Sequence, residues 1–144
     1  MEQNTPYKPY WLSYPELVKI AYGVPIFVDS DEENSFNPKI KAIEKAITSK
    51  TKAIIINSPN NPTGTVYSKK TLKELAELAV SKGLYIISDE IYEKLIYEDQ
   101  KHTSVAALSN NIKDHTITVN GVSKAYSMTG WRIGWIAAPQ WIAA

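Results

Sequence analysis

The stretch Gly121–Gly134, GVSKAYSMTGWRIG, decides the fold class because it connects two apolar runs that each predict a strand. The run before it, Thr116–Val119, is β-branched and predicts a strand, and Ile133–Ala138 predicts another. The polar residues between them therefore follow the end of a strand. They include Lys124 and Arg132, and Arg132 is the only arginine among sixteen basic residues.

Upstream of this stretch, short apolar runs alternate with helical patterns. Helical spacing of apolar residues predicts helices over Asn37–Lys50 and Ser68–Lys82, and Ser104–Ser109 is weakly helical. Ala53–Asn57 and Leu84–Ile87 are typical of buried strands. Continuous apolar strands separated by helices predict an α/β fold, with a mostly parallel sheet and helices on both faces.

Composition limits the classes of function. The chain of 144 residues is about one domain long, and 44% of its residues are hydrophobic. A net charge of +1 gives no electrostatic basis for binding nucleic acid or an anionic membrane, and no apolar run is long enough to span a bilayer. The chain has no cysteine, which excludes disulfides and thiolate metal sites and fits a cytoplasmic location.

Three polar clusters each follow a strand: Ser58–Gly64, Ser88–Tyr92 and Gly121–Arg132. Carboxyl ends of parallel strands meet at one edge of a sheet, where ligands of α/β proteins bind. Taken alone, each cluster has a simpler interpretation as a turn, a helix cap or a surface lysine. Trp131 and Trp135 are likewise more typical of a core than of a ligand platform. Together the clusters predict a small-molecule site.

The functional groups at this edge match one cofactor. A lysine among cationic and hydrogen-bonding groups is suited to Schiff-base chemistry, and a carboxylate can hold the proton of a pyridine nitrogen. Arginine with nearby hydroxyls is suited to a phosphate. These groups indicate pyridoxal 5′-phosphate. They are supplied by Asn61, Asp89, Tyr92, Ser123, Lys124, Thr129 and Arg132.

The sequence resembles the class I aminotransferases of the aspartate aminotransferase type, which are pyridoxal-phosphate enzymes of fold type I. Gly121–Gly134 carries the family's lysine pattern. SPNNPTG (Ser58–Gly64), SDEIYE (Ser88–Glu93) and PYWLSYPE (Pro9–Glu16) precede it in the family's order. The resemblance implies that residues 1–144 form part of the cofactor-binding large domain. It also implies that an N-terminal segment and the small domain lie outside this sequence.

The resemblance assigns a role to each matching residue. Lys124 would be the catalytic residue, binding the cofactor covalently and moving a proton between the substrate and the cofactor. Asp89 would hold the pyridine proton, and Tyr14 would support Asp89. The remaining roles are hydrogen bonds to the phenolic oxygen from Asn61 and Tyr92, ring stacking by Trp11, and phosphate binding by Ser123 and Arg132.

The family also implies partners and substrates. Its members transfer an amino group between an amino acid and a 2-oxo acid in amino acid metabolism, and they are homodimers. With Arg132 assigned to phosphate, no second arginine remains here for the substrate carboxylate. The family has a central strand before Pro9, whereas Met1–Tyr7 is polar and makes a poor strand.

Three alternatives stay open on the sequence. Carbon–sulfur lyases and cyclopropane-carboxylate synthases share the equivalents of Asp89, Tyr92, Lys124 and Arg132, although the SYPE and MTGWRIG details favour the aminotransferases. The chain could instead be a non-catalytic remnant that binds the cofactor or a partner. A purely structural α/β domain would leave the convergence of the four motifs unexplained.

Overall fold

A computed structural model describes residues 9–143. Its longer elements are the helices α1 (Ser13–Ile20), α2 (Ile40–Ala46) and α3 (Lys69–Ser81), and the strands β1 (Ala53–Asn57), β2 (Tyr85–Asp89), β3 (Thr116–Gly121) and β4 (Gly134–Ala137). Three short helices are α4 (Asn110–Lys113), α5 (Val122–Ala125) and α6 (Gln140–Ala143). Single 3₁₀ turns form η1 (Glu32–Asn34), η2 (Val105–Ala107) and η3 (Thr129–Trp131).

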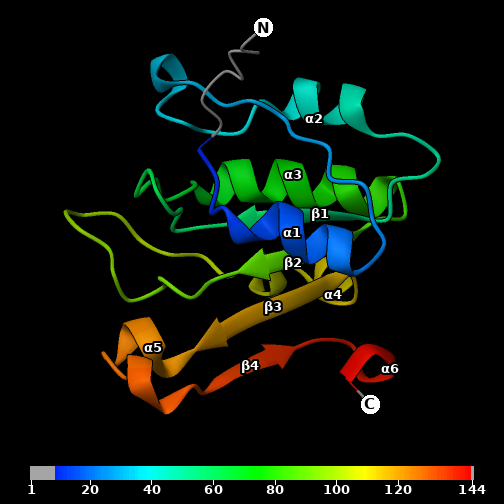
Figure 1. The fold of residues 1–144 in the computed structure, drawn as a ribbon. Helices are drawn as coiled ribbons and strands as arrows, with labels where there is room; N and C mark the ends of the chain where they lie inside the picture. Colours follow the sequence, from blue (N-terminus) through cyan, green and yellow to red (C-terminus); the bar gives the residue numbers. More distant parts are fainter. Residues whose placement is uncertain (1–8, 144) are drawn as a thin grey trace, which may run out of the picture.

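The four strands form one sheet in the order β1-β2-β3-β4 (Figure 1). The first three are parallel, with Asn57 of β1 opposite Asp89 of β2 and Asp89 opposite Val119 of β3. β4 runs antiparallel to β3, with Gly121 opposite Gly134. The prediction of a mostly parallel sheet is confirmed, and the direction of β4 is a detail that the apolar pattern does not reveal.

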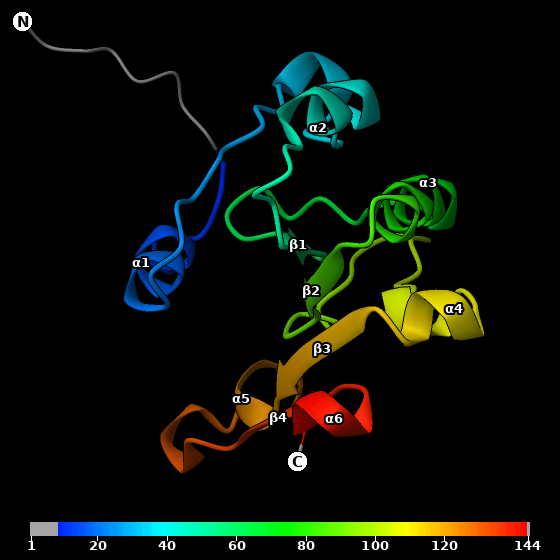
Figure 2. The same ribbon diagram turned by 90° about the vertical axis from the view of Figure 1, so that its right-hand side faces the viewer.

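Helices lie on both faces of the sheet, as predicted. Figure 2 shows α1 on one side of the strands and α3 and α4 on the other. The core forms on the side of α3, where Leu72, Leu75, Ala76 and Ala79 are almost fully buried against Ile86 of β2. The apolar stripe of α3 therefore anchors the sheet on this face, and α1 covers the opposite face.

Ends of the elements follow local chemistry. Ser68 caps α3 by accepting a hydrogen bond from the Thr71 amide, and Gly83, at φ +65°, ends it, so this helix is confirmed nearly residue for residue. The helix expected over Asn37–Lys50 is shorter and stops at Ala46. Beyond it, Thr48 and Thr51 hydrogen-bond to nearby backbone amides, which competes with helical pairing.

One expectation about side chains differs from the structure, and one expected strand is not tested by it. Trp131 and Trp135, expected in the core, are 67% and 45% exposed, because β4 and η3 have no further layer over them among residues 9–143. The polar strand expected over Met1–Tyr7 lies outside the described residues. Among the described residues, no helix is long and apolar enough to cross a membrane.

Candidate active site

The three polar clusters meet at the carboxyl edge of the sheet. Asn57 and Asp89 end neighbouring strands in register, and β3 ends at Gly121, directly before α5. A Cβ atom at Gly121 would lie 2.9 Å from the Ile133 carbonyl oxygen, and 3.2 Å from Cδ1 of Ile91. Glycine at this position therefore lets the start of α5 approach both β4 and the loop after β2.

Asp89 is held from two sides. The Tyr14 hydroxyl of α1 donates a 2.6 Å hydrogen bond to Oδ2, and the Ile91 amide donates one of 3.1 Å to Oδ1. Burial raises the pKa of the Tyr14 phenol well above its ordinary value of 10.0, and the hydrogen bond to Asp89 and the charge of that carboxylate raise it further. Tyr14 is therefore a fixed proton donor to Asp89 across the physiological range.

A second group of site residues surrounds Tyr92. The Asn61 side-chain amide lies 3.4 Å from the Tyr92 hydroxyl, at the long end of hydrogen bonding. The Lys124 amine lies 5.6 Å from the centre of the Tyr92 ring, in cation–π range. No hydrogen bond or ion pair between residues within 9–143 engages this amine. Lys124 is half-buried and has no carboxylate partner in that part of the chain.

Asn57 joins the two groups, and its role is not evident from sequence alone. Its side chain is buried at the end of β1, where Nδ2 donates 3.1 Å to the Asp89 carbonyl and Oδ1 accepts 2.8 Å from the Asn61 amide. The turn that follows is closed by Gly64, at φ +74°. The sequence signal that could have indicated this role is an apolar strand that ends in asparagine, four residues before Asn61.

Of the remaining candidates, Trp11 contacts the Asp89 group through Tyr14, whereas Ser123 and Arg132 have no contact with either group among the interactions of residues 9–143. Trp11 packs edge-on against Tyr14, with ring centres 5.4 Å apart, and is 44% exposed. Ser123 precedes Lys124 on α5, and Arg132 is exposed and donates to the Thr129 carbonyl at 3.0 Å. Arg132 adopts a left-handed conformation, φ +54°, directly after η3. Both lie on the segment that follows β3, the same segment as Lys124.

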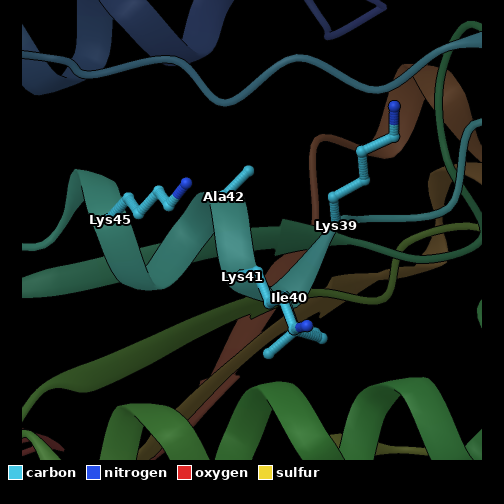
Figure 3. Close-up of a pocket in the computed structure, with 5 residues that line it drawn as sticks. All are labelled: Lys39, Ile40, Lys41, Ala42 and Lys45. Carbon is cyan, nitrogen blue, oxygen red and sulfur yellow. The ribbon is translucent and has the colours of Figure 1, made fainter.

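A hollow elsewhere on the surface has the wrong chemistry for a site. It is lined by Lys39, Ile40, Lys41, Ala42 and Lys45 of α2 and the residue before it (Figure 3). The three amines point to separate places, and Lys39 is engaged in an ion pair with Asp31. No group of three or more metal-ligating side chains occurs in the described part of the chain. The strand-end cluster is therefore the candidate active site.

Comparison of the sequence with protein families and curated relatives gives the same family in each case. The model of the family "Aminotransferase class I and II" matches residues 7–144. An aspartate aminotransferase of Geobacillus stearothermophilus is 54% identical over 132 residues, and an asparagine–oxo-acid transaminase of Streptococcus mutans is 45% identical over 137. These alignments cover 92% and 94% of this chain, but 34% and 35% of the relatives.

Solved structures show the same partial coverage. The aspartate aminotransferase of Thermus thermophilus, solved with maleate, superposes with a TM-score of 0.88 at 49% identity. The match covers 93% of this chain and 34% of that one. The chain thus spans about a third of the length of these relatives, and it has the fold of the corresponding third.

Proposed function

The chain belongs to the class I and II aminotransferases, and from this premise we propose that it binds pyridoxal 5′-phosphate through Lys124 and transfers an amino group between an amino acid and a 2-oxo acid. The observation that carries the proposal is the junction at the strand ends. Asp89, bonded to Tyr14 at 2.6 Å, ends β2, and Lys124, beside Tyr92, lies on α5 directly after β3, so both lie at the same edge of the sheet.

The donor set of the site fits the cofactor. Asp89 is a carboxylate for the pyridine nitrogen, and Asn61 and Tyr92 are two adjacent donors for a phenolic oxygen. Lys124 offers an amine for the aldehyde, and Ser123 and Arg132 offer a hydroxyl and a cation for the phosphate. Trp11, beside Tyr14, offers an aromatic face for the ring.

The protein's own residues would perform the proton chemistry. When bound, the cofactor supplies an electron sink, since its protonated pyridine ring accepts the electron pair released at the substrate α-carbon. Asp89 would hold the pyridine proton, and the Tyr14 hydroxyl would keep this carboxylate oriented and ionised. The Nζ atom of Lys124 would be the base that accepts the proton from the substrate α-carbon and the acid that then gives it up.

Chemical trapping tests the assignment of Lys124. The chain is mixed with pyridoxal phosphate, reduced with borohydride and digested, and the added mass is located by peptide mass spectrometry. We expect the mass on the peptide that contains Lys124, and its loss in Lys124→Ala. Lys113→Ala is the matched control, because Lys113 is an exposed lysine at the end of α4. Labelling spread over Lys69, Lys70 and Lys82 would contradict the assignment.

Substrate and assembly are part of the same proposal. Two of the relatives are named for aspartate and for asparagine, which are four-carbon amino acids with an acidic or amide side chain, and these names support testing such donors first. We propose aspartate as the first amino donor to test, and a homodimer as the working assembly. Sedimentation of the cofactor-loaded protein tests the dimer, and a panel of amino donors tests the substrate.

A further inference from the structure

Glu90, the residue after Asp89, is a buried carboxylate that the proposed chemistry does not use. It is 2% exposed, yet it comes directly after the residue that faces α1. Oε1 accepts hydrogen bonds from the Ser88 hydroxyl at 2.9 Å, the Ser104 hydroxyl at 3.1 Å and the Val105 amide at 3.1 Å. Oε2 lies 3.0 Å from Nε2 of His102.

These bonds keep the carboxylate charged inside the protein. Burial by itself raises the pKa of Glu90, but the hydrogen bonds from His102, Ser88 and the Val105 amide outweigh it and leave the pKa lowered. A buried carboxylate destabilises a fold unless it is paired and fully hydrogen-bonded. The four partners meet that requirement, and they come from both sides of a long loop.

The loop that Glu90 closes carries a site residue. It runs from Ile91 to Ser104 without a helix or strand, and it contains Tyr92. At its far end, His102, Ser104 and the Val105 amide all bind one carboxylate. Within the described residues Nδ1 of His102 is buried without a hydrogen-bond partner, so the ring is held at its Nε2 edge alone.

Glu90 and Asp89 point to opposite faces of the sheet. Successive side chains of a strand alternate between faces. Asp89 accordingly meets Tyr14 of α1, while Glu90 binds the residues leading into η2, which packs with α3 and α4 on the other side. The Glu90 amide also donates 2.9 Å to the Val119 carbonyl, continuing the ladder to β3. The two neighbouring carboxylates are therefore held by contacts on opposite faces of the sheet.

We propose that Glu90, with His102, is a positioning clamp: it holds the loop of residues 91–104 against the far face of the sheet and so fixes Asp89 and Tyr92 in the candidate site. The role in positioning cofactor-binding residues rests on the proposed function, whereas the contacts between Glu90 and the loop do not depend on it. Small misplacements of such groups reduce catalysis by about a hundredfold, so an anchor of this kind matters for cofactor orientation.

The Ile91 amide is a direct reporter of the clamp, because it donates to Oδ1 of Asp89. Amide hydrogen exchange measured by NMR should speed up at Ile91 and through the loop in Glu90→Ala by roughly tenfold or more. Glu90→Gln keeps one acceptor oxygen and should give an intermediate rate. Amides of α3, which lie in the core, should speed up only by the factor that the loss of global stability sets, so the readout is the extra acceleration of the loop over α3. Glu93→Gln is the matched control, since among residues 9–143 the Glu93 carboxylate pairs with its exposed neighbour Lys94, at 3.8 Å, and not with the far end of the loop.

Variants of His102 separate the hydrogen bond from packing. His102→Gln places an amide nitrogen near the position of Nε2 and should restore slow exchange, whereas His102→Leu should not. Visible circular dichroism of bound pyridoxal phosphate is the second readout, because its intensity per bound cofactor reports orientation. It should fall in Glu90→Ala and stay unchanged in Ser81→Ala, which removes only a hydrogen bond to the Leu78 carbonyl at the C-terminal end of α3.

Two outcomes would overturn the proposal. Unchanged exchange at Ile91 in both Glu90 variants would mean that the loop and Asp89 are fixed by other contacts. Faster exchange with unchanged dichroism would leave Glu90 a stabilising residue without a positioning role. Failure of the unmodified chain to take up the cofactor would instead refute the proposed function, and the exchange data would still decide whether the clamp exists.

Discussion

Single hydrogen bonds determine the direction of the key side chains in this site. The bond from Tyr14 to Asp89 spans 75 positions of sequence and joins α1 to β2. It is the contact in the structure that most directly connects the segment before the sheet to the strand ends. Removing it should therefore affect both stability and the orientation of Asp89.

Tyr14→Phe deletes the hydroxyl and leaves the ring in place. Hydrogen bonds to charged groups contribute about 1.5 kcal/mol or more, so we expect the free energy of unfolding to fall by about that amount. Urea unfolding followed by fluorescence measures it. Tyr22→Phe is the matched control, because Tyr22 is 99% exposed, and its variant should unfold like the unmodified chain. Equal stability of the two variants would contradict the contribution of the bond.

Acid should reveal the stabilisation that Glu90 provides. Its pKa in the folded protein lies below the ordinary value of 4.5, so the ionised form stabilises the fold above that pH. The contribution is lost as pH falls through the folded-state pKa. The difference in unfolding free energy between the unmodified chain and Glu90→Gln should therefore be constant near neutrality and shrink below pH 4.5. A difference in unfolding free energy that stays constant down to pH 3 would contradict this contribution of the Glu90 carboxylate.

At the scale of elements, the N-cap of α3 is the local feature that can be tested most simply. The Ser68 hydroxyl accepts from the Thr71 amide at 3.0 Å. Ser68→Ala should lower the free energy of unfolding by about 1 kcal/mol, the usual contribution of such a cap. Thermal unfolding measures the change. Ser49→Ala alters an exposed serine outside any helix and should leave the midpoint where it is.

The same helix shows what sequence predicts well. The bounds of α3 can be predicted because the N-cap, the apolar stripe and the terminal glycine all indicate one helix over Ser68–Gly83. β2 continues two residues beyond its apolar run, through Ser88 and Asp89. These polar residues have no strand preference of their own, but hydrogen bonding to β1 and β3 holds their backbone extended. The antiparallel direction of β4 likewise depends on pairing rather than on composition.

The sequence predicts the candidate site as a set of residues but not as a geometry. Strand-end position and spacing point to Asn61, Asp89 and Lys124, because those signals are local. The bridge made by Asn57 and the clamp made by Glu90 depend on which strands are neighbours. A buried asparagine and a buried glutamate look like a turn residue and a helix cap until the sheet order is known.

At the scale of the whole molecule, arginine chemistry is the limiting feature. The chain contains one arginine, Arg132, and the proposed phosphate contact uses it. Amino acid substrates carry an α-carboxylate, for which arginine supplies a planar, two-bond fit. The fifteen lysines supply only point charges. The relatives are about three times as long, and we propose that they hold this carboxylate from the part of their sequence that the match does not cover.

We therefore expect the 144 residues by themselves to bind the cofactor but to transaminate poorly. Without a cationic clamp on its carboxylate, the substrate is not held with its α-hydrogen facing Lys124, and orientation of this kind is worth several kcal/mol, on the order of a thousandfold in rate. An open site also weakens each electrostatic contact in it. The loaded chain is mixed with aspartate, and pyridoxamine phosphate is measured by chromatography over time. A rate near the enzyme median of about ten per second would contradict the expectation, and would mean that these residues orient the substrate unaided.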